Sequence, residues 1–132
     1  MFGSPYYTKS KYYTKKYILA KNIPKNYDEG KEGIMKITQI RNATLWIEYG
    51  GIKFLIDPWL GPKEYMPGFE GAIHSEIRQP HTNLPFPVEE VVLADAVILT
   101  HVHPDHWDSY AQQALRKDIE FLVQSEADKQ YI

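Results

Sequence analysis

The sequence of 132 residues contains no cysteine. Disulfide bonds and thiolate metal sites are therefore excluded, and the composition is typical of a cytoplasmic protein. Apolar residues never run for more than four positions, which argues against a transmembrane helix or a secretory signal. The net charge is only −2, so the composition as a whole favours neither nucleic acid nor a membrane surface as a partner. We expect one small domain with its own core.

Charge is unevenly divided along the chain. Residues 1–34 have a net charge of +4 and six of the ten tyrosines, whereas residues 35–132 have a net charge of −6. The first part has no helical or strand period, which predicts a disordered tail before a domain. A basic, aromatic arm for single-stranded nucleic acid is the alternative. A third reading is that translation starts naturally at Met35, because codons for Lys31-Glu32-Gly33 can resemble a ribosome-binding site.

Three of the five histidines lie in one short stretch, which starts at His101 and ends at His106. An apolar run at residues 96–99 predicts a buried strand before it, and helical spacing predicts a helix at residues 107–117 after it. The histidines then lie on a loop at the carboxyl end of a strand, where α/β folds build their sites.

The spacing within this stretch indicates metal binding. His101 and His103 are two residues apart, so their rings can converge on one ion, and the adjacent Asp105 and His106 can reach a second ion. A polar loop that happens to be rich in histidine is the alternative. A structural zinc site is disfavoured because the sequence has no cysteine.

The rest of the chain is predicted to be mainly strands and loops. Strands are expected at residues 36–40, 45–49, 52–56, 96–99 and 119–123, and helices near residues 87–91 and after Ser125. Gly50-Gly51 predicts a hairpin turn. Residues 58–90 contain six prolines without a clear period, which predicts a long loop beside the substrate.

The motif His101-x-His103-x-Asp105-His106, together with residues 43–60, resembles the metallo-β-lactamase superfamily, in the branch that includes L-ascorbate-6-phosphate lactonase. The resemblance implies an α+β fold, the N-terminal half of an αββα sandwich, with a mixed, mainly antiparallel sheet and helices on one face. It implies two divalent metal ions, zinc first and manganese or iron as alternatives. His101 and His103 would bind one ion. Asp105, also the candidate catalytic residue, and His106 would bind the other, with Asp57 and Asp108 supporting the ligands.

The resemblance implies a metal-dependent hydrolase that uses a metal-activated water on a lactone or phosphoester. No histidine follows His106, so the ligands that would complete the family's site are missing, and we expect weak or no activity from this chain alone. One alternative function is a non-catalytic metal-binding half-domain that self-associates as a homo-oligomer. Another is nucleic-acid binding through residues 1–34.

Overall fold

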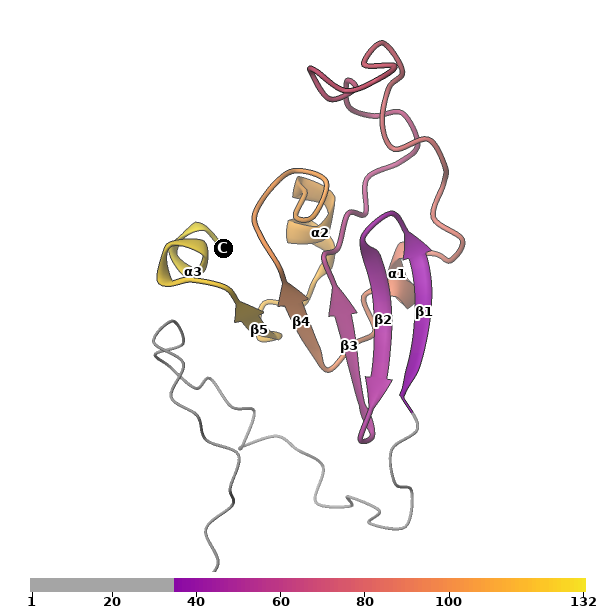
Figure 1. Cartoon of the computed structure of the whole chain (residues 1–132). Coiled ribbons are helices and arrows are strands. Elements are labelled where there is room, and N and C mark those ends of the chain that lie inside the picture. Colours follow the sequence, from indigo (N-terminus) through magenta and orange to yellow (C-terminus); the bar gives the residue numbers. More distant parts are fainter. Residues whose placement is uncertain (1–34) are drawn as a thin grey trace, which may run out of the picture.

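The structure is a computed structural model that describes residues 35–132 (Figure 1). The predicted tail at residues 1–34 lies outside the described residues. The elements are β1 (Lys36–Arg41), β2 (Thr44–Tyr49), β3 (Ile52–Ile56), α1 (Val88–Val91), β4 (Ala96–Leu99), α2 (Ser109–Ala114), β5 (Glu120–Val123) and α3 (Glu126–Tyr131). In this described part, no helix combines the length and the apolar character needed to cross a bilayer.

The first three strands form an antiparallel meander. β1 pairs with β2, and β2 pairs with β3. The turn between β2 and β3 is made by Gly50 and Gly51, whose φ angles are 59° and 77°. Positive φ at both central residues is what a tight hairpin turn of this hand requires, and glycine adopts it without steric cost. The predicted Gly-Gly hairpin is therefore confirmed.

The last two strands turn the sheet from antiparallel to parallel. The strand order is β1-β2-β3-β4-β5, and β4 is parallel to both β3 and β5. The predicted mixed sheet of an α+β fold is confirmed, with two antiparallel and two parallel pairings. Because β3 and β4 are parallel neighbours, the residues that follow them meet at the same edge of the sheet.

One face of the sheet carries the core. Trp46, Leu55, Val97 and Phe121 are aligned across the four strands from β2 to β5, and side chains alternate between faces along each strand. These residues belong to one hydrophobic cluster, which α1 joins through Val91 and α2 through Ala111. The expectation of helices on one face therefore holds for α1 and α2. The indole Nε1 of Trp46 donates to the carbonyl of Val91 at 3.0 Å.

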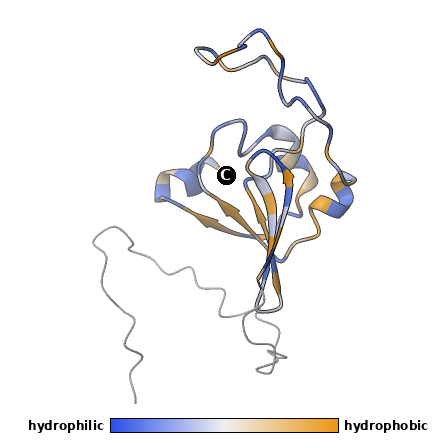
Figure 2. Ribbon diagram, turned by 45° about the vertical axis from the view of Figure 1, so that its right-hand side comes forward, coloured by the Kyte–Doolittle hydropathy of each residue, from blue (hydrophilic) through white to orange (hydrophobic). Residues whose placement is uncertain are grey.

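The second face of the sheet is also mainly apolar. Its register brings together Leu45, Ile56, Ile98 and Leu122 in one row, and Ile47, Phe54, Ala96 and Glu120 in the next. β4 and β5 are mainly orange in Figure 2, the colour of hydrophobic residues. Ile37 and Tyr49 on this face are 56% and 52% exposed. β3, β4 and β5 thus have the mainly apolar character of strands in a sheet that is covered on both sides.

The helix predicted at residues 107–117 is shorter in the structure. Asp108 is extended (φ −105°, ψ 169°) and its side chain accepts from the N–H of Ala111, so α2 begins at Ser109. The helix ends at Ala114, because Leu115 has returned to an extended conformation. Trp107 and Leu115 fit the helical spacing, but both pack into the core from outside the helix.

Candidate metal centre

The histidine-rich stretch leaves the carboxyl end of β4, as predicted. The structure brings His101, His103 and Asp105 together, with one ligand atom of each lying within 4.8 Å of the others. The ring centroids of His101 and His103 are 4.6 Å apart, and those of His101 and His106 are 3.8 Å apart. The Nε2 atom of His106 lies 3.5 Å from a carboxylate oxygen of Asp105. The four predicted ligands therefore lie side by side.

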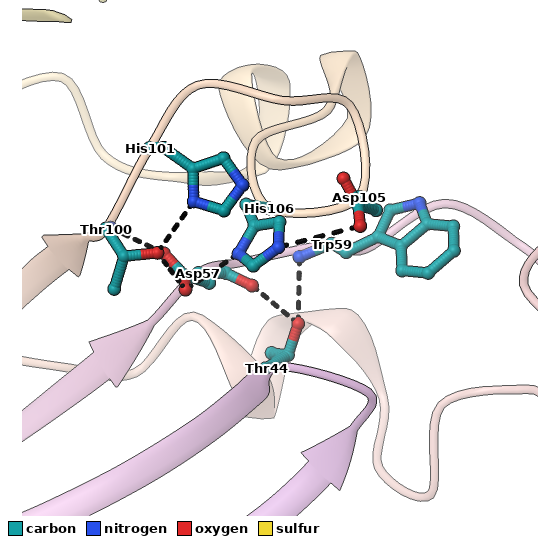
Figure 3. A network of polar contacts seen from close by, with 7 residues as sticks. All are labelled: Thr44, Asp57, Trp59, Thr100, His101, Asp105 and His106. Atoms are coloured by element: carbon teal, nitrogen blue, oxygen red, sulfur yellow. Dashed lines mark hydrogen bonds and ion pairs between the residues drawn. The ribbon is translucent and has the colours of Figure 1, made fainter. Parts of the chain in front are cut away.

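Two of these rings are held by their Nδ1 atoms. The Nδ1 of His106 lies 2.8 Å from the carboxylate of Asp57, and the Nδ1 of His101 lies 3.0 Å from the hydroxyl of Thr100 (Figure 3). The Thr100 hydroxyl donates to Asp57 at 2.7 Å, so it accepts from His101. Both rings then carry their proton on Nδ1, which leaves each Nε2 lone pair free to bind a metal ion.

Asp57 is the support behind the histidines, at the point where β3 ends. Its backbone N–H donates to the carbonyl of Ile98 at 3.0 Å, which continues the parallel ladder by one step. Its carboxylate accepts from the backbone N–H of Thr100 at 2.7 Å as well as from the Thr100 hydroxyl and His106. The side chain is buried, and its negative charge lies directly against the ring that it orients. This geometry is what the predicted supporting role requires.

The backbone of Asp57 is in an unusual conformation, with φ at +43°. Few residues other than glycine occupy this left-handed region. Thr44, fully buried at the start of β2, spans the turn with its hydroxyl. The hydroxyl donates to the carbonyl of Asp57 at 2.6 Å and accepts from the N–H of Trp59 at 3.0 Å. Figure 3 shows this link below the histidines.

Asp108 supports the metal loop in a different way from Asp57. Its carboxylate accepts from the backbone N–H groups of Leu60 at 3.2 Å and Gly61 at 2.7 Å, from the Tyr65 hydroxyl at 3.0 Å, and from the N–H of Ala111 at 2.9 Å. None of these bonds goes to a predicted ligand. Asp108 therefore ties the end of the metal loop to residues 60–61, and at the same time caps α2.

Tyr65 extends this contact into the long loop. Its hydroxyl accepts from the indole Nε1 of Trp59 at 3.0 Å and donates to Asp108. Burial of the phenol, which disfavours the charged form, raises the pKa of Tyr65 to about 12, and the neighbouring Asp108 charge acts in the same direction. The phenol therefore remains a hydrogen-bond donor at neutral pH.

Arg41 holds the other side of the same segment. Its guanidinium donates to the carbonyls of Trp59 at 2.6 Å, Gly61 at 2.8 Å and Thr82 at 2.9 Å. Only 4% of the residue is exposed. Burial lowers the pKa of Arg41, and the negative charge of Asp108 partly offsets that effect. One buried cation thus holds the start of the long loop predicted at residues 58–90 next to Thr82, which lies in the last third of the loop.

Sequence reasoning missed Arg41, Thr44 and Tyr65. Arg41 and Thr44 lie in strands, where arginine and threonine are ordinary residues, so the sequence carries no local signal of their role. The other two histidines, His74 and His81, are exposed, and they contact Glu76 and Gln79 in the loop.

The donor set fits a divalent metal ion. Imidazole nitrogens and carboxylate oxygens are the ligands of zinc, manganese and iron sites in proteins. The Nε2 of His106 and the Asp105 carboxylate lie 3.5 Å apart. Two ligands of one zinc ion lie about 3.3 Å apart at ordinary bond lengths. His101, His103, Asp105 and His106 would hold the metal, but their assignment to one ion or two stays a prediction.

Comparison with known proteins agrees with this geometry. No family model matches the sequence. The chain is 44% identical over 95 residues to the UPF0173 protein YddR of Bacillus subtilis (strain 168), a match that covers 71% of this chain and 37% of that protein. The chain is homologous to YddR over those residues. It therefore spans little more than a third of the length of this relative.

Two solved structures share the fold. The isothiocyanate hydrolase from Delia radicum gut bacteria superposes with a TM-score of 0.71 at 53% identity, over 73% of this chain and 37% of that one. A protein described as "a possible metal-dependent hydrolase" from Veillonella parvula DSM 2008 superposes with a TM-score of 0.72 at 39% identity, over 75% and 38% of the two chains. The α+β fold of this chain thus corresponds to one part of the fold of these two proteins. The L-ascorbate-6-phosphate lactonase branch stays a prediction.

Proposed function

We propose that this chain carries the metal-binding part of a metal-dependent hydrolase. The observation that carries the proposal is the convergence of His101, His103 and Asp105 within 4.8 Å at the carboxyl ends of β3 and β4. The homology to an isothiocyanate hydrolase and to a "possible metal-dependent hydrolase" supports the same class of reaction.

The substrate class follows from the site and from the relatives. A divalent metal ion, when bound, lowers the pKa of a water molecule and polarises the bond that is attacked. The substrate would be a small molecule with an electrophilic carbon or phosphorus. We add isothiocyanates to the lactones and phosphoesters expected from the sequence. The central carbon of an isothiocyanate is electrophilic because it lies between nitrogen and sulfur. Zinc remains the preferred metal, in a two-ion site, with manganese or iron as alternatives.

The residues of this chain have separate tasks in that reaction. His101 and His106 present their Nε2 atoms, because Thr100 and Asp57 hold their Nδ1 protons. His103 is exposed, so we expect the substrate to approach from its side. The Asp105 carboxylate reaches the same space and can take up a proton released there.

Metal binding is the first test, because it does not require the complete site of the longer relatives. Zinc titration by calorimetry and cobalt titration by visible absorption are to be measured on the 132-residue chain and on His103→Ala. We expect His103→Ala to lose at least tenfold in metal affinity, because it removes one of the converging nitrogens. His74→Ala, which removes an exposed loop histidine, is the matched control and should bind as the wild-type chain does. Equal affinity of His103→Ala and His74→Ala would contradict the proposal.

Hydrolysis of an isothiocyanate and of a lactone by the metal-loaded chain is the second test. We expect weak or no turnover, because the chain matches only 37% and 38% of the two related structures. Turnover at the rate of an ordinary enzyme, about 10 per second, would show that the chain needs no further ligands.

The other functional predictions concern partners. Self-association is favoured by one observation, the apolar second face of the sheet, and analytical ultracentrifugation tests it through the concentration dependence of the molecular mass. Nucleic-acid binding through residues 1–34 falls outside the described residues. A cytoplasmic location stays a prediction.

A further inference from the structure

Residues 57–61 form a segment whose backbone is held from three directions. Every N–H in the segment has an acceptor: Asp57 donates to Ile98, Trp59 to Thr44, and Leu60 and Gly61 to Asp108. The carbonyl of Asp57 accepts from Thr44, and the carbonyls of Trp59 and Gly61 accept from Arg41. Since the segment is buried, each of these groups would be costly to leave unpaired.

We infer that Thr44 is a positioning residue for the metal centre, through the conformation it imposes on Asp57. Its hydroxyl is the only side-chain group among the described residues that bonds both sides of this turn, the carbonyl of Asp57 and the N–H of Trp59. These two bonds hold Asp57 at its positive φ of 43°. Thr44 itself contacts no predicted ligand.

The effect reaches the metal ligands in two steps. The left-handed backbone of Asp57 directs its carboxylate at Thr100 and His106, which it meets at 2.7 Å and 2.8 Å. If the Thr44 hydroxyl is lost, the Asp57 carbonyl has no partner to hold the strained φ, and the residue can relax towards the β region. The carboxylate then moves away from His106, and the Nε2 of His106 is no longer held towards Asp105.

The charged residues around the segment, Arg41 and Asp108, do not hold the backbone of Asp57. Arg41 binds the carbonyls of Trp59 and Gly61, and Asp108 binds the N–H groups of Leu60 and Gly61. Both therefore hold the distal half of the segment. The half that contains Asp57 is held by the bond from the Asp57 N–H to the Ile98 carbonyl and by the two bonds of the Thr44 hydroxyl. The inference deepens the proposed function, because it rests on His106 as a metal ligand.

A matched pair of variants separates the hydroxyl from the shape of the side chain. Thr44→Val keeps the β-branched shape and removes the hydroxyl, whereas Thr44→Ser keeps the hydroxyl and removes the methyl group. Zinc affinity by calorimetry and the visible spectrum of bound cobalt are to be measured on the 132-residue chain. We expect Thr44→Val to bind about tenfold more weakly, as the loss of a supporting contact typically does, with a shifted cobalt spectrum. Thr44→Ser should bind within about threefold of the wild-type chain and keep its spectrum.

The outcomes are distinguishable. A Thr44→Val chain with wild-type zinc affinity and an unchanged cobalt spectrum would overturn this inference alone. A wild-type chain that binds neither zinc nor cobalt would overturn the inference and the proposed function together.

A second measurement needs no variant, so it decides the matter even if Thr44→Val fails to fold. Coupling between two sites is reciprocal, so metal binding must stabilise the segment that positions the ligand. Amide hydrogen exchange of the wild-type chain with and without zinc should show a larger slowing at Trp59 and Asp57 than at Ile47 and Phe54 in the strands. Equal slowing at all four amides would overturn the inference.

Discussion

Replacement of Asp108 by asparagine tests whether the metal loop depends on this carboxylate for its stability. One carboxylate oxygen accepts from the N–H groups of Leu60 and Ala111, and the other accepts from the N–H of Gly61 and the hydroxyl of Tyr65. Asparagine has nearly the same shape, but it offers only one acceptor oxygen. If the amide nitrogen replaces the oxygen near Leu60 and Ala111, both N–H groups lose their acceptor. If it replaces the other oxygen, the Gly61 N–H loses its acceptor, whereas the Tyr65 hydroxyl can accept from the amide.

The magnitude follows from the charge and the burial of the site. A hydrogen bond to a charged group contributes about 1.5–3 kcal/mol, so the loss of one or two lowers the free energy of unfolding by about 1.5–6 kcal/mol. Asp108 is 5% exposed, so water cannot replace the lost partners. Because a small domain has a stability of only about 5–15 kcal/mol, the variant should be close to the limit of folding.

Urea unfolding, followed by tryptophan fluorescence and by circular dichroism, measures this difference. Asp118→Asn is the matched control, because Asp118 makes an exposed ion pair with Arg116 at 3.0 Å, and it should change the free energy of unfolding by less than about 0.5 kcal/mol. A value for Asp108→Asn within about 1 kcal/mol of the wild-type chain would refute the reasoning.

Three further predictions concern the core, the phenol and the surface. Leu55→Ala, at a fully buried position in the centre of the sheet, should lower the free energy of unfolding by about 2–5 kcal/mol in urea titration, and a smaller loss would mean that the core closes around the gap. In a difference titration of ultraviolet absorbance between the wild-type chain and Tyr65→Phe, the missing tyrosine should ionise near pH 12 instead of pH 10. Because the pKa of Tyr65 is raised in the folded state, its contribution to stability is complete below pH 10 and is lost as the pH rises through about 12. Measurement of the free energy of unfolding at several alkaline pH values checks this. Lys36→Met breaks an exposed ion pair with Glu48 and should change the free energy of unfolding by less than about 0.5 kcal/mol; a larger loss would contradict the assignment of this pair to the solvated surface.

The strands could be predicted because their signal is local. Alternation of apolar side chains and the Gly50-Gly51 turn locate β1, β2 and β3 within one residue at each end. The apolar run before His101 locates β4 in the same way. The boundaries of α2 could not be predicted from periodicity, because Trp107 and Leu115 continue the apolar pattern for a tertiary reason. Both fill the core beside a helix that the Asp108 cap begins and the extended Leu115 ends.

The candidate ligands could be identified from the sequence, but most of the residues that support them could not. His101, His103, Asp105 and His106 are close in sequence. The structure adds the convergence of the first three and the contact of His106 with Asp105. The supporting bonds connect residues that are far apart in the chain. Thr44 lies 13 residues from Asp57, and Arg41 lies 41 residues from Thr82. Nothing in the local sequence distinguishes such residues from other strand residues, so their roles appear only when the strands are placed side by side.

The apolar second face of the sheet makes the stability of this fold depend on its surroundings. Ile37 and Tyr49 leave more than half of their surface in contact with water, and each square ångström of apolar surface removed from water contributes about 25 cal/mol. A molecule that binds this face of the folded chain, and does not bind the unfolded chain, stabilises the fold by mass action. The stabilisation grows with the logarithm of the ratio of its concentration to its Kd. A melting temperature measured on the chain in dilute buffer is therefore the minimum for this fold, and it rises with whatever occupies the sheet.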